Sequence, residues 1–353
     1  MAIYIIIEPA YSASSWCSNI VQGIFHQARQ KRIDCFIQNE NFVTQNTDLI
    51  ALLGNSLSWI CGTLGKIKAS HSAHIVLVSN TPYPLSVNYI CTDLQQTMLD
   101  IMSYLRNDCG KKEIAFYGVN PSSTTDILKQ RGFYKSENVY YSDDDLRSCF
   151  EKFYTDIQKY DAVICSNDYA AISLIQNLRQ CDPQQIQRLF FVSFANTHIA
   201  QEYEPSITSV ALDYYEYGRN TVNLYQMLLK NPQISTLNIN IKSSIIPRNT
   251  TQNIPYTGNS CNGLIPEQKS NVFFDDNEIR DLVTLENLFN TLDQTDEKII
   301  KYLSDNYSYE MISQELFMSV NGIKYRLSKL LETCGINSRK ELIQIYNKYF
   351  KPE

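Results

Sequence analysis

Short β-branched runs alternate with longer segments of helical period over the first 250 residues of this chain. Alternation of this kind is typical of parallel sheets that are covered by helices on both faces, because buried parallel strands have continuous apolar sequences. The pattern therefore predicts an α/β fold for this part of the chain. The runs that we expect to form strands are Ile3 to Ile7, Ile33 to Ile37, Ile75 to Val78, Ile114 to Tyr117, Ala162 to Cys165 and Phe190 to Ser193.

Apolar residues recur at helical spacing between these runs. Four of them from Val21 to Ala28 stand at positions i, i+3, i+4 and i+7, which predicts one amphipathic helix. Another helix is expected to begin after the acidic residues Asp143, Asp144 and Asp145. The N-terminal end of a helix dipole favours negative charge, so we interpret these carboxylates as capping groups rather than catalytic ones.

The composition changes near residue 250. The stretch from Asn249 to Asn271 is polar and contains spaced proline and glycine residues, which is typical of an inter-domain linker. After it, the segment from Asp275 to Leu292 carries an apolar stripe at helical spacing. That helix must bury its stripe against the next domain or against its copy in a second subunit. We favour a connecting helix that also dimerises.

The last 62 residues divide into four short segments of helical pattern with tight joints. Thr295, Ser308 and Ser319 are expected to cap the first three helices, and Gly335 is expected to end the third. The joint between the second and third helices is only three residues long, and Phe317 at its start is expected to point inward. Two helices joined in this way form a helix-turn-helix.

The third of these helices carries basic residues on its outer face. Lys324, Arg326 and Lys329 lie between Val320 and Leu331, a stretch without an acidic residue. A solvated helix face is the alternative interpretation. The mixture of polar, apolar and basic side chains suits base edges and phosphates in a major groove. The residues predicted to contact DNA are Val320, Asn321, Lys324, Tyr325, Ser328 and Lys329.

Composition and charge add a few constraints. The net charge of −6 does not by itself favour a polyanion as partner, but the last 62 residues hold nine basic and nine acidic side chains. The whole acidic excess therefore belongs to the first 291 residues.

The ten cysteines contain no CxxC pair, which indicates reduced, mostly buried thiols. The N-terminal apolar run is too short for a signal peptide or a membrane helix, so we expect a cytoplasmic protein.

Motifs of enzymes and metal sites are absent from the sequence. His71 and His74 form its single close histidine pair, and no cysteine or carboxylate cluster accompanies them, so no metal site is expected. The sequence has no GxGxxG, GxxxxGK[ST] or GxSxG motif and no nucleophile with a neighbouring base. We expect neither an enzyme nor a cofactor.

The stretch from Leu292 to Ile343 resembles the LuxR/GerE-type DNA-binding domain without a gap. This resemblance implies that the helix after the turn docks in the major groove, that Lys324 touches DNA, and that the helix from Arg339 to Tyr349 forms a dimer contact. Gly322, Asn306 and Arg326 stand where that family usually has Thr, Gly and His. The matching positions include Ser308, Ile312, Leu316, Ser319, Ile323, Lys324, Leu330, Gly335, Ile336 and Arg339.

Three segments of the first 250 residues resemble the sensor of the LacI/GalR repressors. They are Asp161 to Ala171, Pro205 to Val210 with Gly218 after it, and Ile245 to Thr250. The resemblance implies two α/β lobes that close on a ligand by hinge motion, with the chain leaving the first lobe near residue 118 and returning near residue 247. The DNA-binding headpiece that usually precedes this sensor is not expected, because Met1 lies two residues before the first predicted strand.

The same resemblance implies a set of ligand-binding residues. Trp16 would stack on an apolar ring face, Asn167 would hydrogen-bond the ligand beside Asp168, and Lys129 stands where the family usually has Arg. Asn167 follows a predicted strand at its carboxyl end, where α/β sheets bind ligands. Helix capping by Asn167 and Asp168 is the alternative, and Trp16 has the alternative of a half-buried core residue. The family's Asp after the strand from Phe190 is Ala195 in this chain.

These observations predict a two-lobed, periplasmic-binding-protein-like α/β sensor in residues 1–250, a linker and connecting helix in residues 251–291, and an all-α, four-helix helix-turn-helix domain in residues 292–353. The predicted function is that of a transcription regulator that binds double-stranded DNA as a homodimer. A small-molecule effector, a sugar or related metabolite, would control it. The alternatives are a regulator whose ligand-free sensor is a platform for protein interaction and dimerisation, and a solute-binding protein.

Overall fold

The computed structural model describes residues 2–38, 48–70, 74–83, 85–143, 145–258 and 277–350. The chain divides into two compact units, residues 1–264 and residues 265–353. Several residues named above lie outside the described ranges, so the structure does not bear on them. They are His71, Asp144, residues 259–271 of the linker, and Asp275 and Asp276 at the start of the connecting helix.

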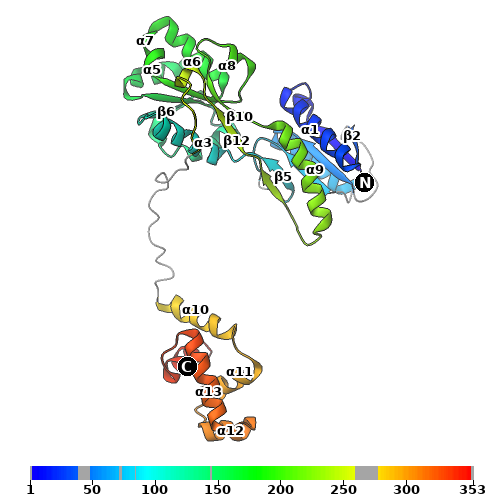
Figure 1. Cartoon of the computed structure of the whole chain (residues 1–353), viewed down its shortest axis with the longest axis vertical. Helices are drawn as coiled ribbons and strands as arrows, with labels where there is room; N and C mark the ends of the chain where they lie inside the picture. Colours follow the sequence, from blue (N-terminus) through cyan, green and yellow to red (C-terminus); the bar gives the residue numbers. More distant parts are fainter. Residues whose placement is uncertain are drawn as a thin grey trace. The chain divides into compact units, whose positions relative to one another are not determined.

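The first lobe of residues 1–264 is a parallel sheet between helices. Its elements are β1 (Ala2–Ile7), η1 (Pro9–Tyr11), α1 (Ser15–Lys31), β2 (Asp34–Gln38), β3 (Leu49–Leu53), α2 (Leu57–Ser70), β4 (His74–Val78), β5 (Asn88–Cys91), α9 (Tyr214–Lys230) and β11 (Asn238–Asn240). The strand order is β11-β5-β4-β3-β1-β2, and each neighbouring pair is parallel. Helices α1 and α9 lie side by side on one face (Figure 1), and α2 covers the other.

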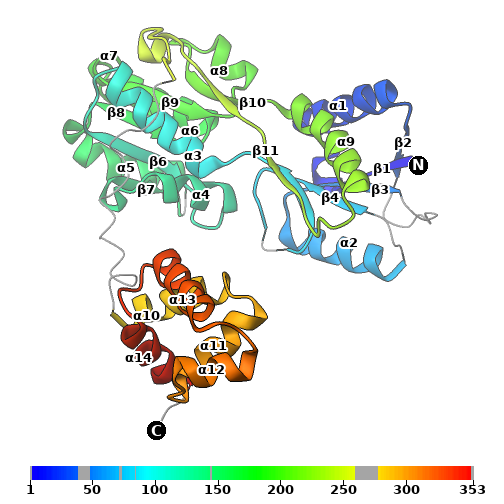
Figure 2. The same cartoon turned by 60° about the horizontal axis from the view of Figure 1, so that its bottom comes forward.

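The second lobe repeats this architecture. Its elements are α3 (Leu94–Ser103), η2 (Tyr104–Asp108), β6 (Ile114–Val119), α4 (Thr124–Gly132), η3 (Ser136–Asn138), β7 (Val139–Tyr141), α5 (Leu146–Asp156), η4 (Ile157–Lys159), β8 (Ala162–Cys165), α6 (Asp168–Cys181), α7 (Gln184–Arg188), β9 (Phe190–Phe194), α8 (His198–Glu202), β10 (Thr208–Leu212), β12 (Ser243–Ile246) and η5 (Asn249–Thr251). The order is β12-β10-β9-β8-β6-β7, and β12 alone in this order runs antiparallel to its neighbour. Helices α5 and α6 cover one face, and α3 the other (Figure 2).

The chain crosses between the lobes at places other than the expected ones. It leaves the first sheet after β5 and enters the second lobe near Thr92, returns near Asp213 before α9, and crosses again near Lys242 between β11 and β12. The expected crossings near residues 118 and 247 are therefore wrong. Residue 118 belongs to β6, which already pairs with β7 and β8 in the second sheet.

Thr92 ties the crossing segments together. Its hydroxyl donates a hydrogen bond of 2.8 Å to the carbonyl oxygen of Ile241 and accepts one of 2.6 Å from the hydroxyl of Tyr217. Thr92 belongs to the first crossing, Ile241 to the third, and Tyr217 to the helix that follows the second. Thr92 thus links the first and third crossings to each other and to helix α9, which follows the second.

The C-terminal unit is all-helical over residues 277–350. Its elements are α10 (Asn277–Phe289), α11 (Gln294–Ser304), α12 (Tyr309–Leu316), α13 (Val320–Cys334) and α14 (Arg339–Phe350). Leu285 and Leu288 of α10 are buried in one core with Ile299, Ile323 and Leu342 from the other helices. Helix α10 therefore buries part of its apolar stripe within this unit.

Most of the expected helix caps are present. The side chain of Asp145 accepts a hydrogen bond of 2.7 Å from the backbone N–H of Ser148 at the start of α5. Ser308 caps α12, and Ser319 caps α13 through the N–H of Gly322. Gly335 ends α13 with φ at +68°, a left-handed conformation that costs glycine little.

Two expectations in the C-terminal unit are wrong. Helix α11 is capped by Asp293 rather than by Thr295, because the Asp293 carboxylate accepts the N–H groups of Thr295 and Asp296, both at 2.8 Å, in a capping box. Phe317 is 96% exposed rather than inward, because it ends α12 in a left-handed conformation with φ at +51°. That conformation turns its ring away from the core.

Candidate functional site

A cavity of about 370 Å³ lies between the two lobes. This volume is within the range of small-molecule sites. Its first-lobe residues follow the carboxyl ends of β1, β3 and β4, and its second-lobe residues follow the carboxyl end of β6, which is where parallel sheets bind ligands. None of the lining side chains is ionisable to a charge at neutral pH. They belong to Tyr11, Trp16, Asn55, Asn80, Thr81, Tyr83, Ser122, Ser123, Thr124 and Thr125.

Aromatic rings form the wall at β1 and α1. Trp16, half-buried in the first turn of α1, has its ring centroid 5.5 Å from that of Tyr11 and 6.0 Å from that of Tyr214. The sequence places Trp16 here because α1 begins at Ser15, directly after the short turn that follows β1. This aromatic group offers an apolar surface to the cavity.

Amide groups form the opposite part of the first-lobe wall. The backbone N–H of Asn80 donates a hydrogen bond of 2.9 Å to the side-chain oxygen of Asn55, and the Tyr214 hydroxyl donates one of 3.1 Å to the side-chain oxygen of Asn80. These bonds fix both oxygens, and within the described residues the two amide nitrogens have no partner. The buried hydroxyl of Thr81 also lacks a partner there. This wall can therefore donate hydrogen bonds to a ligand.

The second lobe contributes a row of hydroxyl groups at the start of α4. Ser123 caps α4 through the N–H of Asp126 and shares a hydrogen bond of 2.8 Å with the Thr125 hydroxyl. The exposed side chains of Ser122 and Thr124 flank this pair. Hydroxyl groups both donate and accept hydrogen bonds, so this row complements the amide wall.

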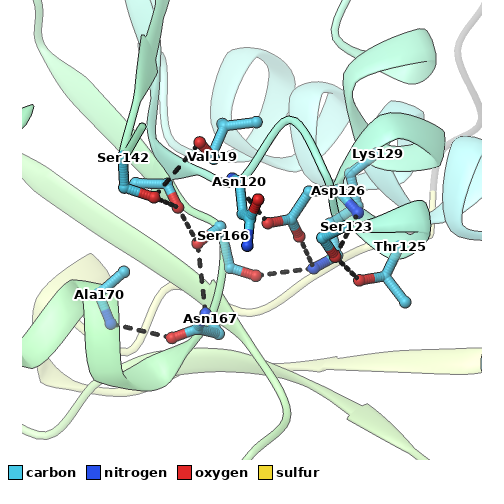
Figure 3. Close-up of polar contacts among 11 residues, drawn as sticks. Val119, Asn120, Ser123, Thr125, Asp126, Lys129, Ser142, Ser166, Asn167 and Ala170 are labelled. Atoms are coloured by element: carbon cyan, nitrogen blue, oxygen red, sulfur yellow. Dashed lines mark hydrogen bonds and ion pairs between the residues drawn. The ribbon is translucent and has the colours of Figure 1, made fainter. Parts of the chain in front are cut away.

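Lys129 lies behind this row (Figure 3). It is 6% exposed, and its ammonium group donates hydrogen bonds of 2.9 Å to Asp126 and 2.7 Å to the carbonyl oxygen of Ser166. The same group lies 4.5 Å from the centroid of the Phe194 ring. Burial lowers the pKa of Lys129, and the charge of Asp126 opposes that shift. The Lys129 ammonium group, which was expected to contact a ligand, is therefore bound by Asp126 and Ser166 of the protein itself.

Asn167 and Asp168 begin α6. The Asn167 side chain caps the helix by accepting a hydrogen bond of 2.9 Å from the N–H of Ala170 (Figure 3). Asp168 is fully buried, and its carboxylate accepts hydrogen bonds from the hydroxyls of Ser193 and Ser209 and from the N–H and hydroxyl of Thr197. Both residues therefore have the geometry of the capping alternative, together with a buried polar network around Asp168.

The structure thus brings one of the four predicted ligand residues, Trp16, to the cavity wall. Lys129, Asn167 and Asp168 are not among the described residues that line it. The amide and hydroxyl residues of the cavity were not predicted, although the sequence holds a signal for them. Each of them follows the carboxyl end of a strand, and Asn55 was overlooked because the preceding run, Leu49–Leu53, was not predicted as a strand.

The predicted DNA-contacting residues share one face of α13. Val320 is half-buried, whereas Asn321, Lys324, Tyr325, Ser328 and Lys329 are exposed. The Tyr325 side chain is 71% exposed, which is unusual for a large aromatic ring. The turn before α13 is held by a hydrogen bond of 3.1 Å from the N–H of Met318 to the carbonyl oxygen of Ser313. The turn therefore presents the start of α13 to solvent.

Two cations of the C-terminal unit meet at one aromatic ring. The Lys324 ammonium lies 5.4 Å from the centroid of the Tyr309 ring, and the Arg339 guanidinium lies 4.8 Å from it. Tyr309 begins α12 and Arg339 begins α14, so three helices bring these groups together. The result is a local positive surface beside the exposed face of α13.

The first unit is similar to known domains in both sequence and fold. Residues 109–251 match the family model of the periplasmic binding protein-like domain. The two parallel-sheet lobes with flanking helices are similar in fold to those of CcpA, a transcription regulator of Lactococcus lactis. The fold expected from the sequence is confirmed for this unit.

Particular relatives are transcription regulators. Catabolite control protein A of Staphylococcus epidermidis is 24% identical over 229 residues, which cover 60% of this chain and 67% of that protein. The structure of CcpA of Lactococcus lactis has a TM-score of 0.56 at 18% identity and covers 71% of this chain and 100% of its own. The CelR–cellobiose complex has a TM-score of 0.55 at 14% identity, and the match covers 70% of this chain and 84% of CelR. CcpA of Weissella paramesenteroides with bound sucrose has a TM-score of 0.52 at 16% identity, and the match covers 70% of this chain and 97% of that protein.

Other predictions concern cysteines, metals and membranes. Eight described cysteines are free thiols, but only Cys17, Cys91, Cys149 and Cys165 are buried, so the expectation of mostly buried thiols holds for half of them. Within the described ranges, no cluster of three or more potential metal-ligating side chains occurs. Over the same residues, no helix combines the length and apolar character needed to cross a membrane.

Proposed function

We propose that this chain is a cytoplasmic transcription regulator in which the two-lobed unit binds a neutral, hydroxylated metabolite and controls DNA binding by the C-terminal helices. The observation that carries the sensor half is the interlobe cavity, with its aromatic wall and uncharged hydrogen-bonding groups. Such a lining suits a sugar, which has apolar ring faces and a rim of hydroxyl groups. Cellobiose and sucrose in the related regulators support this class of ligand.

The DNA-binding half of the proposal is supported by the geometry of α12 and α13. We propose that they act as a helix-turn-helix, since a short turn joins them and exposed polar and basic side chains share the outer face of the second helix. A recognition helix contacts base edges from such a face, and lysines contact phosphates. We propose the predicted set from Val320 to Lys329 as the DNA contact.

A homodimer is part of this proposal. One small DNA-binding module buries only about 600 to 1,000 Å² on DNA, so useful affinity requires two half-sites. Leu282, Val283 and Phe289 of α10 are partly exposed although they are large and apolar, and Phe350 of α14 contacts Phe289 with ring centroids 5.3 Å apart. We propose that α10 and α14 form the dimer contact.

Trp16→Ala should abolish ligand stabilisation. We expect a binding sugar at a hundredfold excess over its Kd to raise the Tm of the wild-type sensor by about 5 °C or more, because binding of the native state alone stabilises it by about 2.7 kcal/mol. Without the Trp16 ring, the stacking surface is lost and the shift should fall below about 1 °C. Differential scanning fluorimetry with cellobiose, sucrose and glucose measures this.

Tyr325→Ala is the matched control, because it removes an exposed aromatic ring from the other unit. It should keep the full shift. If no sugar or other metabolite in a broad panel shifts the wild-type Tm, the alternative of a ligand-free sensor that acts as an interaction platform is favoured instead. Ligand roles for Lys129, Asn167 and Asp168 stay predictions that the same assay can address.

Lys324→Ala and Lys329→Ala should each weaken DNA binding across all sequences. Each lysine that neutralises a phosphate releases about one counterion, so each substitution should reduce the slope of log K against log salt by roughly 1. Fluorescence anisotropy with a labelled mixed-sequence duplex at several KCl concentrations measures both effects. Lys298→Ala is the control, because this exposed lysine of α11 does not line the groove beside α13. Unchanged binding in both lysine variants would remove the assignment of α13 as the recognition helix.

A further inference from the structure

Arg326 differs from Lys324 and Lys329 of α13, because carboxylates hold its cation, whereas within the described residues no ion pair joins either lysine to a carboxylate. Its Nη1 atom lies 2.7 Å from Oδ2 of Asp293 and 2.9 Å from Oδ1 of Asp296. Asp293 and Asp296 form the capping box of α11, so this contact joins α13 to the start of the first helix of the domain. Lys324 and Lys329, by contrast, are exposed.

The two carboxylates border the proposed DNA-binding face. Asp293, Asp296 and Arg326 line a groove of about 570 Å³ that Tyr325 and Lys329 also line. The side chain of Asp293 is 54% exposed in this groove, whereas that of Asp296 is 10% exposed. The hydrogen bond from Arg326 lowers the pKa of Asp293 to about 2, so this carboxylate stays ionised at any pH used for DNA binding.

We propose that Arg326 is a positioning residue that promotes DNA binding through Asp293 and Asp296 rather than through contact with DNA. This inference rests on the proposed function. Carboxylates beside a phosphate-binding face repel DNA, and the repulsion acts over a Debye length of about 10 Å at 0.1 M salt. The guanidinium cancels part of that charge and fixes α13 against α11.

The alternative is that Arg326 leaves the carboxylates and contacts a phosphate or a base edge. The two roles differ in their salt dependence and in their response to a second substitution. A phosphate contact adds to the number of released counterions, whereas a neutralising contact within the protein does not. Removal of the carboxylate charge compensates for the loss of Arg326 only if Arg326 acts through that carboxylate.

The test uses the full chain and the variants Arg326→Gln, Asp293→Asn and Arg326→Gln/Asp293→Asn. Asparagine caps helices about as well as aspartate, so Asp293→Asn removes the charge and retains the cap of α11. Binding to a fluorescent mixed-sequence duplex about 30 base pairs long, roughly three helical turns, is measured by anisotropy over a range of KCl concentrations. Thermal unfolding of each variant is followed in parallel.

Arg326→Gln is expected to weaken binding about threefold to tenfold with an unchanged salt slope, and the double variant is expected to return to within about twofold of Asp293→Asn. Arg326→Lys, which keeps the charge, should bind within about twofold of wild type. If Arg326→Gln fails to fold, Asp293→Asn carries the test, because loss of a repelling carboxylate should strengthen binding, and unchanged binding in that variant overturns the inference. No recovery in the double variant, a salt slope reduced by about 1, or unchanged binding in Arg326→Gln each overturns the inference. If the wild-type chain binds no duplex, the proposed function fails and the inference falls with it.

Discussion

Gly218→Ala is expected to destabilise the first lobe by about 3 kcal/mol or more. Helices α1 and α9 cross so closely that a Cβ atom on Gly218 would lie 2.0 Å from the carbonyl oxygen of Ile20 and 2.7 Å from the backbone nitrogen of Ile24. Both neighbours are backbone atoms, so no side-chain rotation can relieve the overlap. The helices would have to move apart and loosen the core that includes Ile20, Ile24 and Tyr217.

Gly62→Ala is the matched control. Gly62 is exposed in the interior of α2, and among the described residues no neighbouring group lies within 4 Å of the position that a Cβ atom would take there. Alanine reduces the conformational entropy of the unfolded chain, so it should stabilise the protein by about 0.5 to 1 kcal/mol. Urea unfolding followed by circular dichroism compares the two variants. Equal midpoints for Gly218→Ala and wild type would show that the helices adjust to the methyl group without cost.

The periodicity of the sequence predicted the layers of the fold because burial imposes that periodicity. Ile75 to Val78 and Phe190 to Ser193 were recognised as strands from their apolar runs, and the buried strands β4 and β9 are found there. The Leu49–Leu53 strand was missed because three of its five residues are leucine, which has no β preference. The crossings between lobes were misplaced because they depend on which strands pair, and pairing across distant segments leaves no local signal.

The candidate site was harder to predict than the fold. The resemblance identified Lys129 by its position along the chain, but the structure shows that Asp126, one helical turn earlier, holds its ammonium group. Asn55 and Asn80 carried no motif, and only the pairing of β3 with β4 brings them together. Residue identity thus indicated polar groups near strand ends, whereas their partners depend on tertiary contacts.

The same distinction applies to the proposed helix-turn-helix. The absence of acidic residues between Val320 and Leu331 indicated that positive charge gathers on this one helix. The carboxylates that hold Arg326 come from Asp293 and Asp296, about thirty residues earlier in the chain. Charge counted along one helix therefore overstated its positive surface, because a neighbouring helix supplies the counter-charge.

Asp168→Ala is expected to destabilise the ligand-free protein by about 3 kcal/mol or more. Its buried carboxylate accepts hydrogen bonds from Ser193, from Ser209 at 2.7 Å, and from the N–H and hydroxyl of Thr197 at 2.7 and 2.8 Å. Alanine would leave these donors without a partner in the core of the second lobe, and each unsatisfied buried group costs about 1 to 3 kcal/mol.

Asn167→Ala is the contrasting neighbour, because it removes only a helix cap and should cost about 1 kcal/mol. Urea midpoints of both variants, measured without ligand, compare the two residues directly. A small loss in Asp168→Ala, no greater than that in Asn167→Ala, would contradict the structural role of the carboxylate. A large loss would show that the four hydrogen bonds of Asp168, which join α6 to β9, β10 and the start of α8, stabilise the second lobe.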